Sequence, residues 1–161
     1  MIRVLIVEDS PVVREFLVHI LGSDPQLEVI GTATNGAHAV EAAQRLRPDV
    51  ITMDIHMPQM NGFDATRRIM ETAPTPIVIV SGSSTVDDIA TTFHALEAGA
   101  LAVVKRPAGI GHPDHAATAR ELLQTVRLMS EVVVVRRWPP ARRMPLAADG
   151  SQETGLEPAA R

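Results

Sequence analysis

Two patterns of apolar residues alternate along the chain. Short runs rich in valine and isoleucine are separated by longer segments in which apolar residues recur every three or four positions, as on one face of a helix. The short runs predict strands at 3–7, 27–33, 50–53, 77–80 and 101–104. The longer segments predict helices at 11–22, 36–46, 62–72, 85–99 and 115–130.

Residues that commonly begin or end helices lie at the expected positions. Ser10 is a suitable N-cap, and Pro11 occupies the first helical position, where its missing N–H costs nothing. Gly22 marks the end of the same helix. Capping residues from Thr85 onward begin the fourth helix, and Gly99 ends it.

Strands that alternate with helices predict an α/β fold. In the run 3–7, every residue after Arg3 is apolar rather than every second one, which is typical of a parallel strand buried on both faces. Helices between parallel strands cross over in a right-handed sense and cover both faces of the sheet. Ligands of such sheets bind at the carboxyl ends of the strands, so the chemistry is expected there.

Polar side chains follow the predicted strands at these ends. They are Glu8 and Asp9 after the first strand, Asp54 after the third, Ser81 after the fourth, and Lys105 and Arg106 after the fifth. Taken alone, Asp9 is also a plausible helix N-cap. Three carboxylates at one edge repel each other unless a cation compensates them or their pKa values shift. Mg²⁺ suits such a site because it prefers oxygen ligands.

This set of residues suits phosphoryl transfer to a carboxylate. Asp54 is the predicted nucleophile, because an ionised carboxylate needs no general base to attack phosphorus. We expect Asp9 to bind Mg²⁺ directly, Glu8 to bind it directly or through water, and the backbone carbonyl of His56 to complete the shell. Ser81 and a cation would bind the remaining phosphoryl oxygens.

Composition narrows the class of protein. The chain has 161 residues, 19 acidic and 15 basic, and no cysteine, which excludes a disulfide scaffold, a thiol nucleophile and cysteine-bound metal. Net acidity and scarce aromatic residues argue against nucleic acid as a partner. No apolar run approaches the roughly 20 residues of a membrane span, and no signal peptide is recognisable. We therefore expect a cytoplasmic protein.

Composition changes near residue 131. Residues 1–130 are predicted to form one domain, and 131–161 a linker or disordered tail. The run 132–135 is either the end of the last helix or a strand-prone linker segment. Four arginines follow it, either as solvated linker charge or as a patch for an acidic partner: Arg136, Arg137, Arg142 and Arg143.

Several motifs together resemble the receiver domains of two-component response regulators. The motifs are Val7-Glu8-Asp9-Ser10, then Asp54-Ile55-His56-Met57-Pro58 with Gly62 four residues on, then Val80-Ser81, then a basic residue before Pro107. The resemblance covers residues 2 to about 130. It implies the flavodoxin-like strand order 2-1-3-4-5, with Asp54 as phosphoacceptor and a histidine kinase as phosphoryl donor.

A closer resemblance extends past the receiver core. The segments Arg106-Pro107-Ala108-Gly109 and Leu128-Met129-Ser130-Glu131-Val132 are similar to those in chemotaxis protein-glutamate methylesterases. This implies a chemotaxis-type kinase as donor. The esterase domain of that family does not follow, so we expect no ester hydrolysis, and the downstream protein or effector domain is unidentified.

Two positions depart from the receiver pattern. Receivers usually have lysine directly before the strand-five proline, whereas this chain has Arg106 there and Lys105 one residue earlier. Because side chains alternate along a strand, one of the two faces Asp54, and we favour Arg106 with Lys105 as the fallback. Val103 stands where many receivers carry the aromatic ring of the switch, so signalling would depend on Ser81. The small Gly82 is expected to leave room for a phosphoryl group.

Other functions fit less well. A non-phosphorylated pseudo-receiver that only binds partners is the main alternative, favoured if Arg106 disables the site. A phosphatase with an aspartyl nucleophile would normally carry Asp-x-Asp on its first strand, which this chain lacks. The sequence also lacks nucleotide-binding glycine motifs and the Gly-x-Ser-x-Gly elbow of serine hydrolases.

Overall fold

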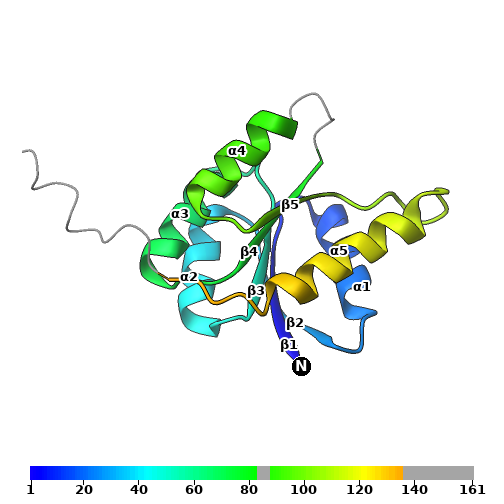
Figure 1. Ribbon diagram of the computed structural model, residues 1–161, viewed down its shortest axis with the longest axis horizontal. Helices are drawn as coiled ribbons and strands as arrows, with labels where there is room; N and C mark the ends of the chain where they lie inside the picture. The colour runs from blue at the N-terminus through cyan, green and yellow to red at the C-terminus, as the bar shows by residue number, and fades with distance from the viewer. Residues whose placement is uncertain (83–87, 136–161) are drawn as a thin grey trace, which may run out of the picture.

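The computed structural model describes residues 1–82 and 88–135, in ten helices and strands (Figure 1). The strands are β1 (Ile2–Val7), β2 (Leu27–Ala33), β3 (Val50–Met53), β4 (Ile77–Ser81) and β5 (Ala102–Lys105). The helices are α1 (Pro11–Gly22), α2 (Gly36–Leu46), α3 (Gly62–Thr72), α4 (Asp88–Ala98) and α5 (His115–Met129).

The strands form one sheet in the order β2-β1-β3-β4-β5, and every neighbouring pair is parallel. This confirms the predicted α/β class and the order 2-1-3-4-5. Because β1 lies beside β3 while β2 lies at the edge, the winding reverses between β1 and β3. The carboxyl ends of β1, β3 and β4 therefore meet at the switch point, where a ligand is expected.

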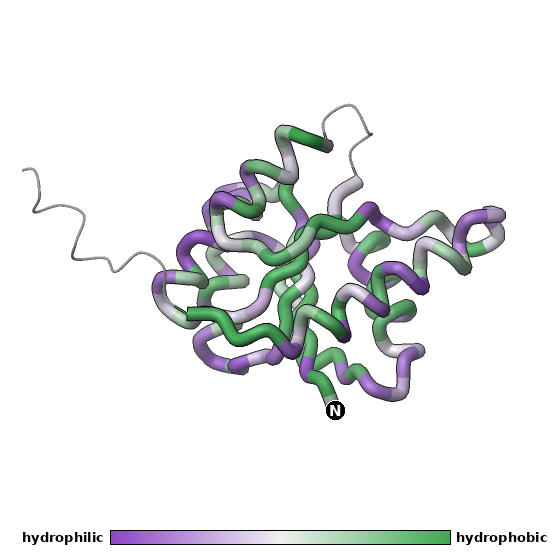
Figure 2. Tube along the Cα trace, viewed as in Figure 1, coloured by the Kyte–Doolittle hydropathy of each residue, from purple (hydrophilic) through white to green (hydrophobic). Residues whose placement is uncertain are grey.

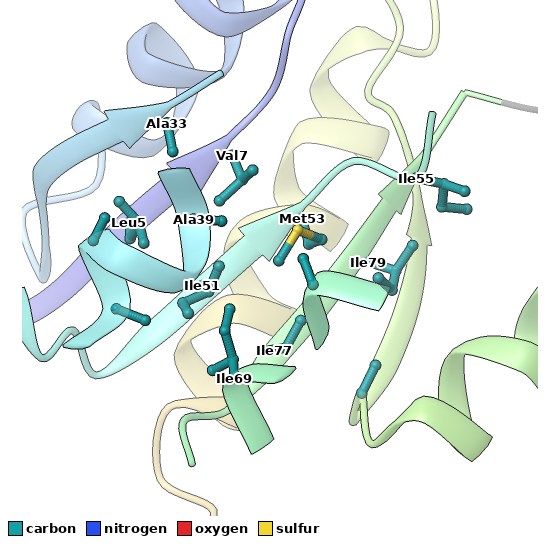
Figure 3. Packing of buried hydrophobic residues seen from close by; sticks show 14 of the residues in the cluster. Leu5, Val7, Ala33, Ala39, Ile51, Met53, Ile55, Ile69, Ile77 and Ile79 are labelled. Atoms are coloured by element: carbon teal, nitrogen blue, oxygen red, sulfur yellow. The ribbon is translucent and has the colours of Figure 1, made fainter. Parts of the chain in front are cut away.

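Helices cover both faces of the sheet, as predicted (Figure 1). Apolar residues of α2, α3 and α4 pack on one face, where Figure 3 shows Leu5, Val7, Ile51 and Met53 from the strands near Ala39 and Ile69 from the helices. Residues of α1 and α5 pack on the other face against alternate strand positions such as Val4 and Ile6. The central strands are mostly hydrophobic in Figure 2 because both of their faces are covered by helices.

Most predicted boundaries agree with the observed ones to within a residue. The strand predicted at 77–80 extends to Ser81, because Ser81 pairs with Lys105 in the β4–β5 ladder. The fourth helix is observed from Asp88, and the cap predicted at Thr85 lies outside the described residues. The Ser10 hydroxyl caps α1 by accepting from the Val13 N–H at 3.4 Å.

The last helix ends at Met129. It does not extend through residues 132–135, which was one of the two alternatives left open by the sequence. Residues 132–135 form neither helix nor strand, and the side chains of Val133 and Val135 are exposed. This hydrophobic segment leads out of α5 at the orange end of the chain in Figure 1. The arginines that follow it lie outside the described residues.

No helix within residues 1–82 and 88–135 is long and apolar enough to cross a membrane.

Candidate functional site

Residues at the carboxyl ends of the central strands line one pocket. They are Glu8, Asp9, Ser10, Val13, Asp54, His56, Gly82 and Arg106. They follow the ends of four strands: β1, β3, β4 and β5. The structure thus brings together most of the polar residues that the sequence predicted at this edge.

The three carboxylates of the pocket lie close together. Glu8, Asp9 and Asp54 each offer an oxygen within 4.8 Å of the others. The ladder continues one residue past β1 and β3, because the Glu8 N–H donates to the Ala33 carbonyl and the Asp54 N–H to the Val7 carbonyl, both at 3.0 Å. Glu8 and Asp54 are buried, whereas Asp9 is exposed at the mouth of the pocket.

Burial makes the ionised forms of the two inner carboxylates unfavourable. It raises the pKa of Glu8 to about 7, and the nearby charge of Asp54 adds to the shift, while the Ser10 N–H and the charge of Arg106 oppose it. Burial also raises the pKa of Asp54, against the opposing hydrogen bond that the Ile55 N–H donates to this carboxylate at 2.8 Å. The pocket therefore favours either a proton or a bound cation.

A hard divalent cation fits this donor set. Two buried carboxylates and one exposed carboxylate offer only oxygen atoms, which Mg²⁺ prefers, and their repulsion is what such an ion would relieve. His56, whose backbone carbonyl is predicted as a further ligand, also lines the pocket.

Gly62 holds the loop after β3 against the end of that strand. A Cβ atom at this position would lie 2.1 Å from the Asp54 carbonyl oxygen, so only glycine allows the approach. The Gly62 N–H donates to the Ile55 carbonyl at 2.8 Å, and the Asn61 side chain caps α3. The glycine of the Asp-x-x-Met-Pro-x-x-x-Gly motif therefore braces the backbone that carries Asp54.

Arg106, not Lys105, brings its side chain to the pocket. The Arg106 N–H donates to the Ser81 carbonyl at 2.8 Å, which continues the β4–β5 ladder past Lys105. Side chains alternate along this extended segment, so Lys105 is exposed on the other face and does not line the pocket. The positive charge of Arg106 lowers the pKa values of both Glu8 and Asp54.

The Arg106 guanidinium lies beside Gly82. The sequence predicted that this small residue leaves room for a phosphoryl group, and Gly82 lines the pocket. The guanidinium occupies the place of a side chain at this position, since a Cβ on Gly82 would be 2.7 Å from Cζ and 2.8 Å from each Nη of Arg106. Ser81, directly before Gly82, is buried at the end of β4.

Arg14 is a residue of this region that the sequence analysis did not single out. Its Nη1 donates to the Glu8 carbonyl at 3.0 Å, from one turn into α1. It thereby ties the helix to the turn that presents Glu8 and Asp9. The only sequence signal is a long cation four residues after the Ser10 cap, which is too common in helices to identify a site.

Val103 stands at the position where many receivers carry an aromatic switch residue. Its side chain is partly buried against the core cluster of the α2–α4 face. Two aromatic rings lie on the neighbouring helices: the Phe63 ring on α3 and the Phe93 ring on α4 are each about 6 Å from the His94 ring.

Comparison with known proteins agrees with this geometry. The sequence matches the response regulator receiver domain family over residues 4–130. It is 67% identical over 138 residues to a protein-glutamate methylesterase/protein-glutamine glutaminase of Nitrosospira multiformis, covering 86% of this chain and 39% of that protein. The chain thus spans about two fifths of the length of the curated relatives it matches.

Solved structures give the same result for the fold. The response regulator domain of Thermotoga maritima CheB superposes with a TM-score of 0.71 at 39% identity, over 83% of this chain and 98% of that one. A chain in the complex of the CheA3 P1 domain with CheY6 from R. sphaeroides superposes with a TM-score of 0.67 at 27% identity, over 81% of this chain and 98% of that one.

Proposed function

Because the chain belongs to the response regulator receiver domain family, we propose that it is a phosphorylation switch in which Asp54 accepts a phosphoryl group. The observation that carries the proposal is one pocket that holds the buried Asp54 carboxylate, two further carboxylates and the Arg106 cation. A structural role does not require such a grouping of buried like charges.

Glu8, Asp9, Asp54 and the backbone carbonyl of His56 would hold Mg²⁺ in this pocket. Bound there, the ion would supply positive charge against the phosphoryl oxygens that approach the carboxylates. The covalent step needs only the chain's own nucleophile: an Asp54 carboxylate oxygen forms a bond to phosphorus, and the bond from phosphorus to the donor's nitrogen or oxygen breaks. Arg106 would bind a phosphoryl oxygen as this happens.

The modified side chain would then change the surface. A phosphoryl group brings about two negative charges and strong acceptor oxygens. Ser81 would hydrogen-bond to one of these oxygens, which would bias the face formed by α4, β5 and α5. Val103 provides no ring to report the change, so the response would begin at Ser81.

The proposed phosphoryl donor is a histidine kinase of the chemotaxis type, which places the switch in the cytoplasm. Support comes from the likeness to a chain in a complex of the CheA3 P1 domain with CheY6, and from relatives that are methylesterases/glutaminases. We propose that residues 1–130 form the receiver and 131–161 a linker, and that the switch itself is not an esterase. Its downstream partner is then a separate protein or an effector domain.

A pseudo-receiver that binds partners without phosphorylation is the second candidate. The specific observation in its favour is Arg106, since a guanidinium is broader and more weakly hydrated than the lysine ammonium usual in receivers. It predicts the same fold and the same pocket but no modification.

Intact-mass measurement separates the two. The purified chain is incubated with acetyl phosphate and Mg²⁺ alongside Asp54→Asn. We expect a gain of one phosphoryl group that requires both Mg²⁺ and Asp54. Arg106→Ala should slow the reaction, while Lys105→Ala, a matched control on the exposed side of β5, should not. No gain, under conditions that modify a known receiver, would leave the pseudo-receiver as the function.

A further inference from the structure

The contact between Gly82 and Arg106 makes the two residues a matched pair. The guanidinium lies directly over the Gly82 Cα, and a Cβ there would lie within 2.8 Å of three of its atoms. Real Cβ contacts are not that short, so any side chain at position 82 would displace the guanidinium. Arg106 is the far end of a flexible side chain, so displacement of the cation is cheaper than distortion of the sheet.

Within residues 1–82 and 88–135, few other contacts hold the Arg106 guanidinium in place. Its Nε atom is buried and has no hydrogen-bond partner among the described residues. None of the ion pairs found within residues 1–82 and 88–135 involves Arg106. The backbone is fixed by the bond to Ser81, but the side chain is positioned by the space over Gly82 and by the charges of Glu8 and Asp54.

We infer that Gly82 determines which cation the site can use: it admits the planar guanidinium of Arg106, and this arginine in turn requires glycine at position 82. A lysine side chain is a slender chain with a compact ammonium, so it would reach the pocket past an alanine. Gly82 then acts as a positioning residue through Arg106 and not as a contact to phosphate. The expected effect on phosphorylation rests on the proposed function. The pairing of Gly82 with Arg106 does not depend on it.

The test uses the parent, Gly82→Ala, Arg106→Lys and the double variant. We expect Gly82→Ala to slow modification of Asp54 by acetyl phosphate at least about tenfold, the size of coupling seen between contacting residues. In the Arg106→Lys background the same alanine should leave the rate unchanged. An equal loss in both backgrounds would overturn the inference, because Gly82 would then be needed by the phosphoryl group itself. No loss in either would overturn it as well.

A second measurement does not depend on phosphorylation. The Nε–Hε resonance of Arg106 in a ¹H–¹⁵N spectrum is assigned by its disappearance in Arg106→Lys. In Gly82→Ala it should shift and exchange faster with water, because the buried Nε would become exposed. Gly22→Ala is the matched control, since a Cβ there meets nothing within 4 Å. An unchanged resonance in Gly82→Ala would refute the pairing. If the parent takes up no phosphoryl group, the proposed function fails and this spectrum still decides the inference.

Discussion

Replacing Glu8 by glutamine should make the metal-free protein more stable at alkaline pH. The Glu8 side chain is 2% exposed, and its pKa is raised from 4.5 to about 7 by burial and by the charge of Asp54. An acid with a raised pKa in the folded state contributes full stability below its unfolded pKa. That contribution is lost as the pH rises through the folded value.

The pKa values set the size of the effect. Each tenfold change in a proton equilibrium is worth about 1.4 kcal/mol, so the shift from 4.5 to about 7 corresponds to about 3 kcal/mol of unfolding free energy. The parent should lose this amount between pH 4.5 and pH 8. Glu8→Gln does not ionise, so the two proteins should differ little at pH 5, and the variant should be up to about 3 kcal/mol more stable at pH 8.

Urea unfolding followed by circular dichroism at pH 5 and pH 8, in EDTA, measures both free energies. Glu15→Gln removes the same charge at an exposed position of α1 and should not change the pH dependence. Mg²⁺ at pH 8 should reverse the order, because the parent keeps the carboxylate that binds the ion and gains stability in proportion to occupancy. The reasoning would be refuted if the free energies of unfolding of Glu8→Gln and of the parent changed by the same amount from pH 5 to pH 8.

Three further outcomes follow from the structure. Mg²⁺ should raise the midpoint of thermal unfolding of the parent at pH 8, and Asp9→Asn should remove most of that gain; an equal gain in both would mean that Asp9 is not a ligand. Arg127→Ala should lower the free energy of unfolding by about 2 kcal/mol, because the ion-paired hydrogen bond from Arg127 to the buried Asp24 carboxylate is lost. Urea unfolding measures this change, and a loss below about 0.5 kcal/mol would contradict the prediction. Leu122→Ala, which truncates a fully buried side chain of α5, should cost about 2–5 kcal/mol in the same assay. The same change at Leu128, an exposed residue of α5, should cost far less.

The layout of the fold could be predicted because the strands of a parallel sheet are buried on both faces. Runs that are almost entirely apolar, such as 4–7 and 50–53, are stable only when both faces are buried, and the helices between them show one apolar face each. The apolar pattern could not locate strand ends that are determined by hydrogen bonds. Ser81 belongs to β4 because it pairs with Lys105, and nothing in its polarity indicates that.

The site was predictable at the level of residue types and strand ends. The carboxylates follow from the rule that ligands bind at the switch point of the sheet. Side-chain alternation left Lys105 and Arg106 open until the bond to Ser81 showed which one continues the ladder towards the pocket. The position of Gly82 was predicted, but the group that fills its space was not, because a sequence does not show which long side chain of a neighbouring strand lies over a glycine.

The order in which the chain supplies the site has a consequence for folding. All three carboxylates are present by residue 54, whereas the cation lies at residue 106, directly after β5. A growing chain that folds from its N-terminus therefore gathers the negative charges before the arginine that offsets them is available. Docking of β5 then covers the open edge of β4 and brings in Arg106, which offsets part of the negative charge, so truncation before residue 102 should leave an assembly destabilised by charge repulsion as well as by an unpaired strand.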